Sequence, residues 1–323
     1  MPDGKGVPLD ELVSTFLFSL EAEAKSARTL EYYRKLLQHF LRYASQRSWT
    51  DTRHLDPRAA REFLAWIASR TYEHPGGNGA RVKRQGSATA AWPYYRALRR
   101  LCNWSVNEGL MEASPLARVR FKPPRAPDIE PFSKEELQRL LAVCDLDIRT
   151  GARFTGLRNK AMLMLFLDTA FRRSEMANLK MRDLNLEIRR VRVMGKGNKP
   201  GMGAFCARTA VALRLYLIER QRRGRTDAVW ITEEGRGFTA PGLDSWFDRL
   251  KKRAGVASKG GVHKLRHTAA LAYLREAKDS FLLQLFLRHE SLEMSRRYTR
   301  GLKAEEAIAA HENGASPVRS LLG

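Results

Sequence analysis

The sequence predicts a mainly α-helical protein with a small antiparallel β-sheet, divided into two domains. Apolar residues recur at helical spacing along most of the 323-residue chain, which is long enough for two domains. Residues 186–206 instead alternate at Ile188, Val191 and Val193 and contain a Gly-rich turn, which is typical of a β-hairpin. Residues 121–137 carry four prolines, which interrupt helices, and therefore predict a linker between the two domains.

The part before the linker predicts a small helical bundle. Residues 28–44 place their apolar side chains on one helical face, and residues 56–69 and 87–110 also have a helical pattern. The last of these helices should start at or after Pro93 or bend there, because proline lacks the N–H that a helix interior needs. Residues 73–86 form a Gly-rich basic segment that we interpret as a loop, either solvated or in contact with phosphate.

The part after the linker should begin with a helix at Ser133, because Ser133 and Glu136 form a capping box ahead of an apolar run. Residues 157–171 are strongly apolar and predict a buried helix. Further helices are expected over residues 207–223, 242–254, 264–277, 280–288 and 303–310, with a short strand at 228–232. The expected division is a first domain at 1–120, a linker at 121–131, a second domain at 132–301 and a C-terminal helix or tail at 302–323.

Charge is the clearest signal in the composition. The chain has 58 Lys and Arg against 35 Asp and Glu, a formal net charge of +23 and a pI near 10.4. Basic residues outnumber acidic ones on both sides of residue 130. A polyanion is therefore the expected partner, and nucleic acid fits better than membrane headgroups, because no lipid anchor or amphipathic basic helix is evident.

Other classes of protein are disfavoured by what the sequence lacks. It has no run of eighteen apolar residues and no signal peptide. Its three cysteines are far apart and form no C-x-x-C pair, which argues against a disulfide framework and against a zinc site built on cysteine. We expect a soluble protein of the reducing cytoplasm.

Two motifs in the first half of the second domain carry ionisable side chains in unusual company. In "DTAFRRSEMANL", Arg172 follows an apolar helix and Glu175 lies one helical turn later; such a pair is also typical of an exposed ion pair. In "GKGNK", Lys196 lies between two glycines that let the chain turn tightly and let the lysine approach a ligand. An ordinary exposed turn lysine fits equally well, and the pattern is not that of a P-loop.

Two further motifs lie near the C-terminus. In "HKLRHT", His263 and Arg266 are three residues apart, so a helix would place both on one face; this is not the H-E-x-x-H zinc motif. In "LRHESLEMSRRYTRG", Tyr298 follows His289 by nine residues and is surrounded by arginines. Taken alone, Tyr298 fits either a surface position on a basic helix or a nucleophile held beside a phosphate.

In order and spacing, the four motifs together match one family. The chain resembles the tyrosine recombinases, the phage integrase and Xer group. "TAFRRSE" is similar to the family's Thr-Gly-x-Arg-x-x-Glu box, "VMGKGNK" to its lysine hairpin, "HKLRHT" to its His-x-x-Arg box and "LRHESLEMSRRYT" to its Leu-Gly-His…Tyr-Thr segment. The resemblance marks six catalytic positions and one supporting position: Arg172, Lys196, His263, Arg266, His289 and Tyr298, with Glu175 in support. "TLEYYRKLLQHFLRYA" resembles the family's helical core-binding domain.

The sequence departs from the family pattern at three places. Ala170 and Arg288 replace glycines, and the hairpin continues "KPGMGAF" where the family usually has an arginine. Alanine is a mild change. Arginine at 288 is the larger one, because glycine there would end or tighten a helix, and an arginine could alter the approach to DNA.

The resemblance implies a reaction at a DNA phosphodiester, and elementary chemistry agrees with the residues. Two guanidiniums, Arg172 and Arg266, suit the non-bridging oxygens because they stay charged and can bind two oxygens at once. His263 and His289 can donate hydrogen bonds and exchange protons near neutral pH.

Tyr298 is the implied nucleophile. Its pKa is ordinarily near 10, so its oxygen needs a cationic surrounding or a base. Lys196 is the candidate acid for the leaving 5′ oxygen. A 3′-phosphotyrosyl intermediate conserves the energy of the broken bond, so neither metal, cofactor nor ATP is expected.

The resemblance also implies a fold and partners. Residues 1–120 would be a SAM-like core-binding domain and 132–301 the catalytic domain, with 302–323 contacting a neighbouring protomer. The partner would be double-stranded DNA with specific recombination sites. A homotetramer, weakly associated off DNA, would exchange strands through a Holliday junction, helped by accessory DNA-bending proteins, in the cytoplasm at the nucleoid.

Three alternatives remain at this point. A type IB topoisomerase uses nearly the same chemistry, and relaxation of DNA without site preference would favour it. A catalytically silent DNA-binding protein of the same fold and a helical RNA-binding protein are the others. A covalent protein–DNA adduct that survives SDS would exclude both of these.

Overall fold

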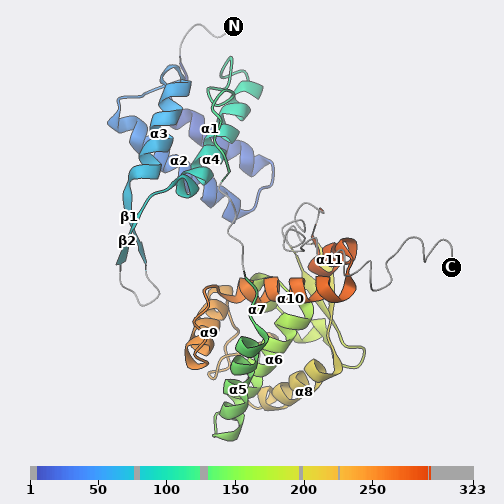
Figure 1. Cartoon of the computed structure of the whole chain (residues 1–323). Coiled ribbons are helices and arrows are strands. Elements are labelled where there is room, and N and C mark those ends of the chain that lie inside the picture. The colour runs from blue at the N-terminus through green and yellow to red at the C-terminus, as the bar shows by residue number, and fades with distance from the viewer. Residues whose placement is uncertain are drawn as a thin grey trace, which may run out of the picture. The chain divides into compact units, whose positions relative to one another are not determined.

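The computed structural model describes residues 6–75, 81–123, 130–195, 199–224, 226–289 and 291 (Figure 1). Contacts divide the chain into two compact units, Met1–Pro127 and Asp128–Gly323, which we describe separately. The division falls within the Pro-rich segment, whose residues 124–129 lie outside the described part. None of the described helices combines the length and the apolar character needed to cross a bilayer.

The first unit is built on four helices: α1 (Leu9–Ala22), α2 (Ala27–Gln46), α3 (Pro57–Ser69) and α4 (Ala88–Asn107), with a 3-10 turn, η1 (Thr52–His54), between α2 and α3. Three of the helices start at side-chain caps, in which Ser26, Asp56 and Ser87 accept backbone N–H bonds. Their apolar faces meet in one core that contains Leu12, Phe16, Leu37, Phe40, Phe63, Leu98 and Leu101.

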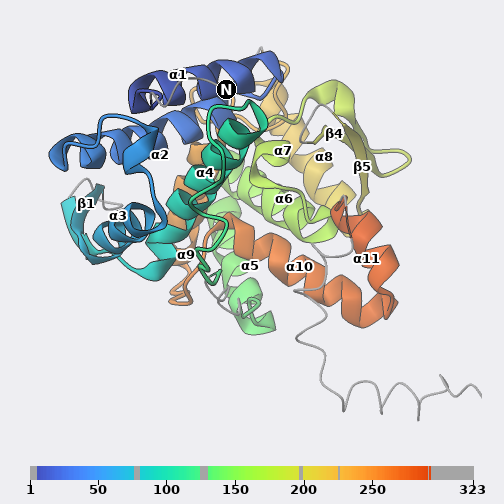
Figure 2. The same ribbon diagram turned by 90° about the horizontal axis from the view of Figure 1, so that it is seen from above.

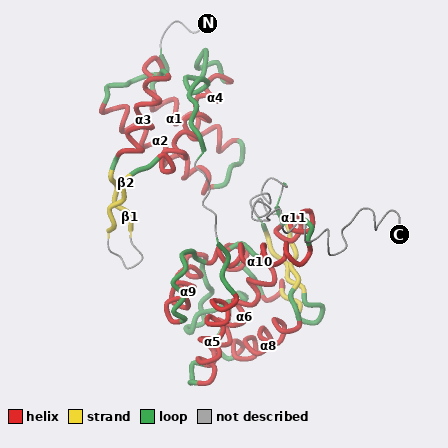
Figure 3. Tube along the Cα trace, viewed as in Figure 1, coloured by secondary structure: helices red, strands yellow, loops and turns green. Residues whose placement is uncertain are grey.

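Two predictions for this unit were wrong, namely a helix start at or after Pro93 and a loop over residues 73–86, whereas a bend at Pro93 stays a prediction. Helix α4 begins at Ala88, five residues before Pro93, because Ser87 caps it; the proline lies inside the helix. Described residues on both sides of 76–80 lie in strands and not in a loop: β1 (Thr71–Pro75) pairs antiparallel with β2 (Arg81–Gln85), with Thr71 opposite Gln85 (Figure 3). Helix α1 was not predicted at all, and no side chain caps its start.

The second unit is built around α6 (Arg153–Thr169), which is buried on nearly all sides. Around it lie α5 (Lys134–Arg149), α8 (Ala207–Gln221) and α10 (Val262–Ala277), as Figures 1 and 2 show. The other helices are the short α7 (Arg173–Ala177), α9 (Ala240–Arg253) and α11 (Ser280–Leu287), and a 3-10 turn, η2 (Met181–Asp183), precedes the sheet. The predicted capping box of Ser133 and Glu136 is confirmed at the start of α5.

The sheet of this unit has three antiparallel strands in the order β3 (Leu184–Asn185), β4 (Arg190–Met194), β5 (Pro200–Ala204). Val191 and Val193 face the core as predicted, and Val193 is opposite Gly201. Ile188 does not belong to the alternation: it lies in the turn before β4 and is 63% exposed. The sheet therefore confirms the predicted hairpin and adds a short third strand.

The expected strand at 228–232 is absent from the described structure. Val229, Trp230 and Ile231 are fully buried, but this stretch makes only isolated bridges, between Lys180 and Ala228 and between Ile231 and Gly237. The burial explains the apolar run that suggested a strand. The expected helix at 303–310 lies outside the described residues.

Candidate active site

The candidate site is assembled where three helices of the second unit end or begin. Helix α6 ends at Thr169, and Ala170 then takes the left-handed conformation, with φ of 47°. This turn lets α7 begin at Arg173, so that Arg172 becomes its N-cap residue. A left-handed residue other than glycine costs about 1–2 kcal/mol, so glycine would adopt this turn with less strain. Ala170 is fully buried among small and apolar side chains of α10 and α11, where a methyl group fits.

Glu175 holds Arg172 by both its backbone and its side chain. The Arg172 backbone N–H donates to Glu175 Oε2 at 2.8 Å, and Arg172 Nη1 donates to Oε1 at 2.8 Å. The Glu175 side chain is 2% exposed, whereas that of Arg172 is 31% exposed. Burial raises the pKa of the Glu175 carboxyl, but the charge of Arg288 and the bonds and charge of Arg172 together lower it below its ordinary value. The carboxylate therefore fixes a guanidinium that solvent can still reach.

Arg266, on α10, connects this turn to the end of α11. Its side chain is buried, and its Nη1 donates to the carbonyl of Ala170 while its Nη2 donates to the carbonyl of Leu287 at 2.8 Å. The same Nη2 lies 3.3 Å from His289 Nε2. One guanidinium thus links the turn that carries Arg172 to the turn that carries His289.

His289 is positioned by the way α11 ends. Arg288 takes the left-handed conformation, with φ of 53°, and the N–H of His289 donates to the carbonyl of Gln284 at 3.0 Å. The N–H of Arg288 donates to the carbonyl of Leu285, which completes a Schellman motif. Gln284 Nε2 also donates to the carbonyl of His289 at 3.2 Å, and His289 is buried. The predicted Leu-Gly-His segment therefore forms the expected tight helix end, with arginine in place of glycine.

The remaining predicted site residues are His263, Lys196 and Tyr298. His263 is exposed in the first turn of α10, one turn before Arg266 on the same helix. Lys196 and Tyr298 lie outside the described residues. The structure therefore brings together Arg172, Glu175, Arg266 and His289, which come from three separate segments of the sequence.

Arg288 belongs to this network, although the sequence pattern marked it only as a departure. Its side chain is 15% exposed, and its Nη2 donates to Glu175 Oε2 at 3.1 Å. Its guanidinium also lies 4.6 Å from the centre of the Phe171 ring. The sequence signal that could have found it is the pairing of an added arginine at 288 with a missing one in the hairpin at "KPGMGAF".

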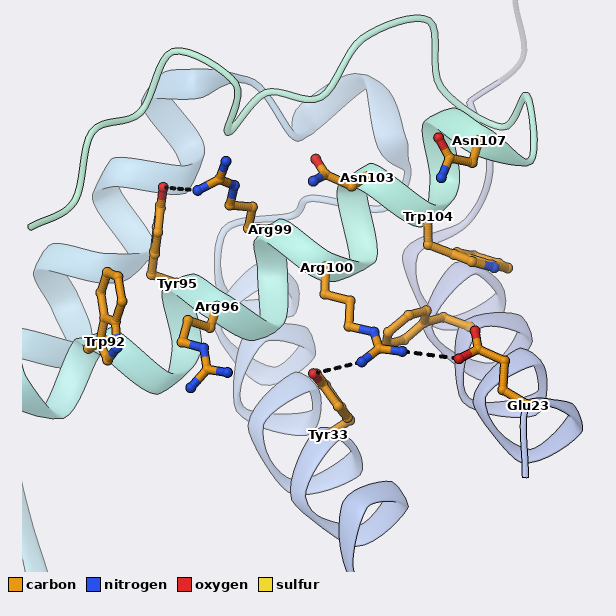
Figure 4. Close-up of a pocket in the computed structure, with 11 residues that line it drawn as sticks. Glu23, Tyr33, Trp92, Tyr95, Arg96, Arg99, Arg100, Asn103, Trp104 and Asn107 are labelled. Atoms are coloured by element: carbon orange, nitrogen blue, oxygen red, sulfur yellow. Dashed lines mark hydrogen bonds and ion pairs between the residues drawn. The ribbon is translucent and has the colours of Figure 1, made fainter. Parts of the chain in front are cut away.

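The first unit has a second candidate surface, on α4, that the sequence reasoning missed. A pocket of about 650 Å³ is lined there by basic, amide and aromatic side chains, several of which Figure 4 shows along one side of the helix: Trp92, Tyr95, Arg96, Arg99, Arg100, Asn103, Trp104 and Asn107. Arg100 donates to Glu23 at 3.2 Å and to the Tyr33 hydroxyl at 3.4 Å. The helical spacing of Arg96, Arg100, Asn103 and Asn107 is the signal that could have found this face.

Known proteins match the second unit as a family domain and most of the chain as whole proteins. Residues 130–305 match the phage integrase family. The chain is 28% identical over 298 residues to the tyrosine recombinase XerC of Oceanobacillus iheyensis, covering 90% of this chain and 92% of that protein. It is 25% identical over 300 residues to the tyrosine recombinase XerD of Listeria innocua, covering 90% and 94%.

Among solved structures, the fold is similar to that of the XerH site-specific recombinase bound to palindromic difH substrate in a post-cleavage complex. The TM-score is 0.67 with 24% identity, and the match covers 90% of this chain and 81% of that one. The family match spans more than half of the chain and includes the whole described network of arginines and His289. The chain therefore belongs to the phage integrase family and is a tyrosine recombinase of the Xer type, a site-specific recombinase that cleaves and rejoins DNA.

Proposed function

We propose that Arg172, Arg266, His263 and His289 bind the scissile phosphate, that Tyr298 attacks it and that Lys196 protonates the leaving oxygen. The observation that carries this proposal is the convergence of Arg172, Arg266 and His289 on one hydrogen-bonded network. A phosphodiester is a monoanion, and its transition state gathers further negative charge on the non-bridging oxygens. Preorganised guanidiniums stabilise that charge without having to reorganise during the reaction.

The exposure of the side chains gives each arginine a different part in this scheme. Arg266 is 2% exposed, and two of its five N–H groups donate to the two turns. It therefore holds the two turns together and offers its positive charge to the phosphate from the buried side of the site. Arg172 is anchored by Glu175 through Nη1, and its partly exposed head is the group that can reach a phosphate from solvent. His263, at the exposed start of α10, approaches from the same helix as Arg266.

In the proposed reaction, the Tyr298 oxygen forms a bond to phosphorus while the bond to the 5′ oxygen breaks. The phenol loses its proton, with His263 or His289 as acceptor, and the departing 5′ oxygen gains one from Lys196. The product is a 3′-phosphotyrosine and a free 5′-hydroxyl. Attack by the 5′-hydroxyl of another strand reverses these steps and joins the strands in a new pairing.

We further propose that both units contact the same DNA duplex. The net charge of +23 supports backbone binding, and the α4 face presents arginines beside asparagines. Arginines suit phosphates or guanine, and asparagine suits the major-groove edge of adenine. The α4 face is thus suited to reading a specific site while the second unit holds the scissile phosphate.

Recombination also needs assembly. We propose a homotetramer on DNA, weakly associated without it, that exchanges strands through a Holliday junction. Residues 302–323 would contact the neighbouring protomer, and accessory DNA-bending proteins would help in bringing sites together. The place of action would be the nucleoid in the cytoplasm.

The test begins with selection of bound sites from random duplex DNA, followed by cleavage of the selected site. The wild-type chain should form a covalent adduct that survives SDS, and Tyr298→Phe should bind the same site with equal affinity but form no adduct. An adduct with the phenylalanine variant would show that another tyrosine is the nucleophile. Relaxation of supercoiled DNA without site preference would instead favour the topoisomerase alternative.

A further inference from the structure

Arg288 makes more connections than a surface arginine at a helix end would make. Its Nη2 donates to Glu175 on α7, and its Nη1 donates to the carbonyls of Phe286, at 3.0 Å, and Thr169, at 3.4 Å. In return, the backbone carbonyl of Arg288 accepts a bond from Arg172 Nη2 at 3.4 Å. The side chain therefore connects the end of α6, the start of α7 and the end of α11, and the residue after it is His289.

These bonds change the charge balance around Arg172. Glu175 alone would neutralise Arg172, because one carboxylate faces one guanidinium. With Arg288 bound to the same carboxylate, the three side chains carry a net charge of +1. The positive charge of Arg172 is then less compensated by Glu175, and more of it acts on an anion that approaches its exposed side.

Arg288 fills space that a side chain at position 201 would otherwise need. A Cβ on Gly201 of β5 would lie 2.7 Å from Arg288 Cδ and 3.6 Å from its Nε, so a side chain at 201 would force the arginine or the strand to shift. Within the described residues, the buried Nε has no hydrogen-bond partner. A buried donor without a partner costs about 1–3 kcal/mol. The bonds and stacking of the rest of the side chain offset that cost.

We infer that Arg288 is a positioning residue of the active site, which shares the Glu175 carboxylate with Arg172 and fixes the turn of Arg172 against the turn of His289. This inference rests on the proposed function. It assigns to Arg288 no contact with the phosphate: Arg288 acts through the orientation and the uncompensated charge of Arg172.

The first test measures single-turnover cleavage and equilibrium binding separately, with the full chain on the selected DNA site. Arg288→Gly should cleave about 10- to 100-fold more slowly at saturating DNA, since small misplacements of reacting groups can cost a factor of about 100. Its dissociation constant should change less than about twofold, because the DNA contacts of both units remain. Full cleavage activity of Arg288→Gly would overturn the inference.

The matched control is Lys278→Gly. Lys278 is an exposed basic residue that ends α10 in the same left-handed conformation, with φ of 52°. This control removes a basic side chain from a left-handed helix end outside the network, so cleavage should be unchanged. A loss equal to that of Arg288→Gly would attribute the effect to general charge or helix-end chemistry and would overturn the inference.

The dependence on Arg172 is tested in a second background. In Arg172→Lys, the additional change Arg288→Gly should slow cleavage by less than about threefold, because coupled residues give non-additive effects. A purely structural role would lower activity equally in both backgrounds, and so would a direct contact of Arg288 with the phosphate. If Arg288→Gly slowed cleavage by the same factor in the wild-type and Arg172→Lys backgrounds, the inference would therefore be overturned.

A stability measurement keeps the inference testable without DNA. Gly201→Ala should lower the melting temperature of the wild-type chain by a few degrees through overpacking, and should lower it less in Arg288→Gly. The other close neighbour of the added methyl group, Val193 at 3.3 Å, is common to both backgrounds. Equal decreases would show that Arg288 does not lie against Gly201. If the wild-type chain formed no covalent adduct, the proposed function would fail. The melting temperatures would still test whether Arg288 packs against Gly201.

Discussion

Replacing Glu175 by glutamine keeps the size of the side chain but removes the charge that two arginines share. Glu175 Oε1 accepts from Arg172 Nη1, and Oε2 accepts from the Arg172 backbone and from Arg288 Nη2. A glutamine has one oxygen and one NH2 group. In either orientation, the NH2 group must face at least one donor that now lacks an acceptor. The variant thus leaves part of a buried charge network unpaired.

The size of this effect follows from the burial of the partners. Breaking a buried ion pair costs about 3–5 kcal/mol. Because the Arg172 side chain is 31% exposed and water can partly replace its partner, we expect the lower end, about 3 kcal/mol. For a domain of this size, about 2–4 °C per kcal/mol predicts a melting temperature lower by about 6–12 °C at pH 7.

The effect should depend on pH in one direction. The pKa of Glu175 in the folded state lies below its ordinary value. The ionised carboxylate therefore stabilises the fold at every pH above that ordinary pKa. This stabilisation is lost as the pH falls through the folded-state pKa. Glutamine does not titrate. The gap in melting temperature between wild type and Glu175→Gln should therefore narrow in acid, below pH of about 4.

Calorimetric melting of the full chain from neutral to acid pH measures both quantities. The control is Asp227→Asn in the same unit, which breaks an exposed ion pair with Lys180 and should change the melting temperature little. Two results would refute the reasoning: a Glu175→Gln variant that melts with the wild type at pH 7, or a gap that stays constant down to pH 3.

Two further predictions concern the chemistry and the reading of DNA. Lys196→Ala should slow cleavage by about 10²–10⁴-fold, but should cleave a substrate with sulfur at the 5′ bridging position nearly as fast as the wild type, because a thiolate leaves without a proton. Arg266→Ala should stay slow on the sulfur substrate, and a Lys196→Ala variant equally slow on both substrates would remove Lys196 as the acid. On α4, Arg96→Ala should weaken binding to all sequences and reduce the salt slope by about 1, whereas Asn103→Ala should change the base preferred at one position of the selected site. Selection with Asn103→Ala that returns the wild-type site would show that this side chain does not read a base.

The parts of the fold that the sequence predicted well are those in which one local signal was strong. Helices α2, α5 and α6 have apolar periodicity, a cap or a long apolar run, and all three are confirmed. The errors arose where two signals competed. Pro93 is a helix breaker, but the cap at Ser87 starts the helix earlier. Ile188 was grouped with the alternating valines of the strand, but the left-handed Arg189 turns the chain between Ile188 and that strand.

The candidate site shows a similar boundary between what sequence patterns can and cannot predict. Arg172, Arg266 and His289 were identified from motif spacing, and the structure brings them together through backbone carbonyls that no side-chain pattern encodes. Arg288 was recognised as unusual, but its charge alone does not tell whether it faces solvent or Glu175. Its direction depends on the left-handed helix end and on the absence of a side chain at Gly201.

The close packing of Gly201 against Arg288 also constrains the order in which this sequence can change. A side chain added at 201 while Arg288 is present meets Cδ at 2.7 Å, so that intermediate is overpacked. Shortening residue 288 first opens the space and relieves the left-handed backbone if glycine is introduced. Mutational paths that add a side chain at position 201 should therefore first pass through a small residue at 288. Descendants that have a side chain at 201 together with Arg288 should be rare among functional sequences.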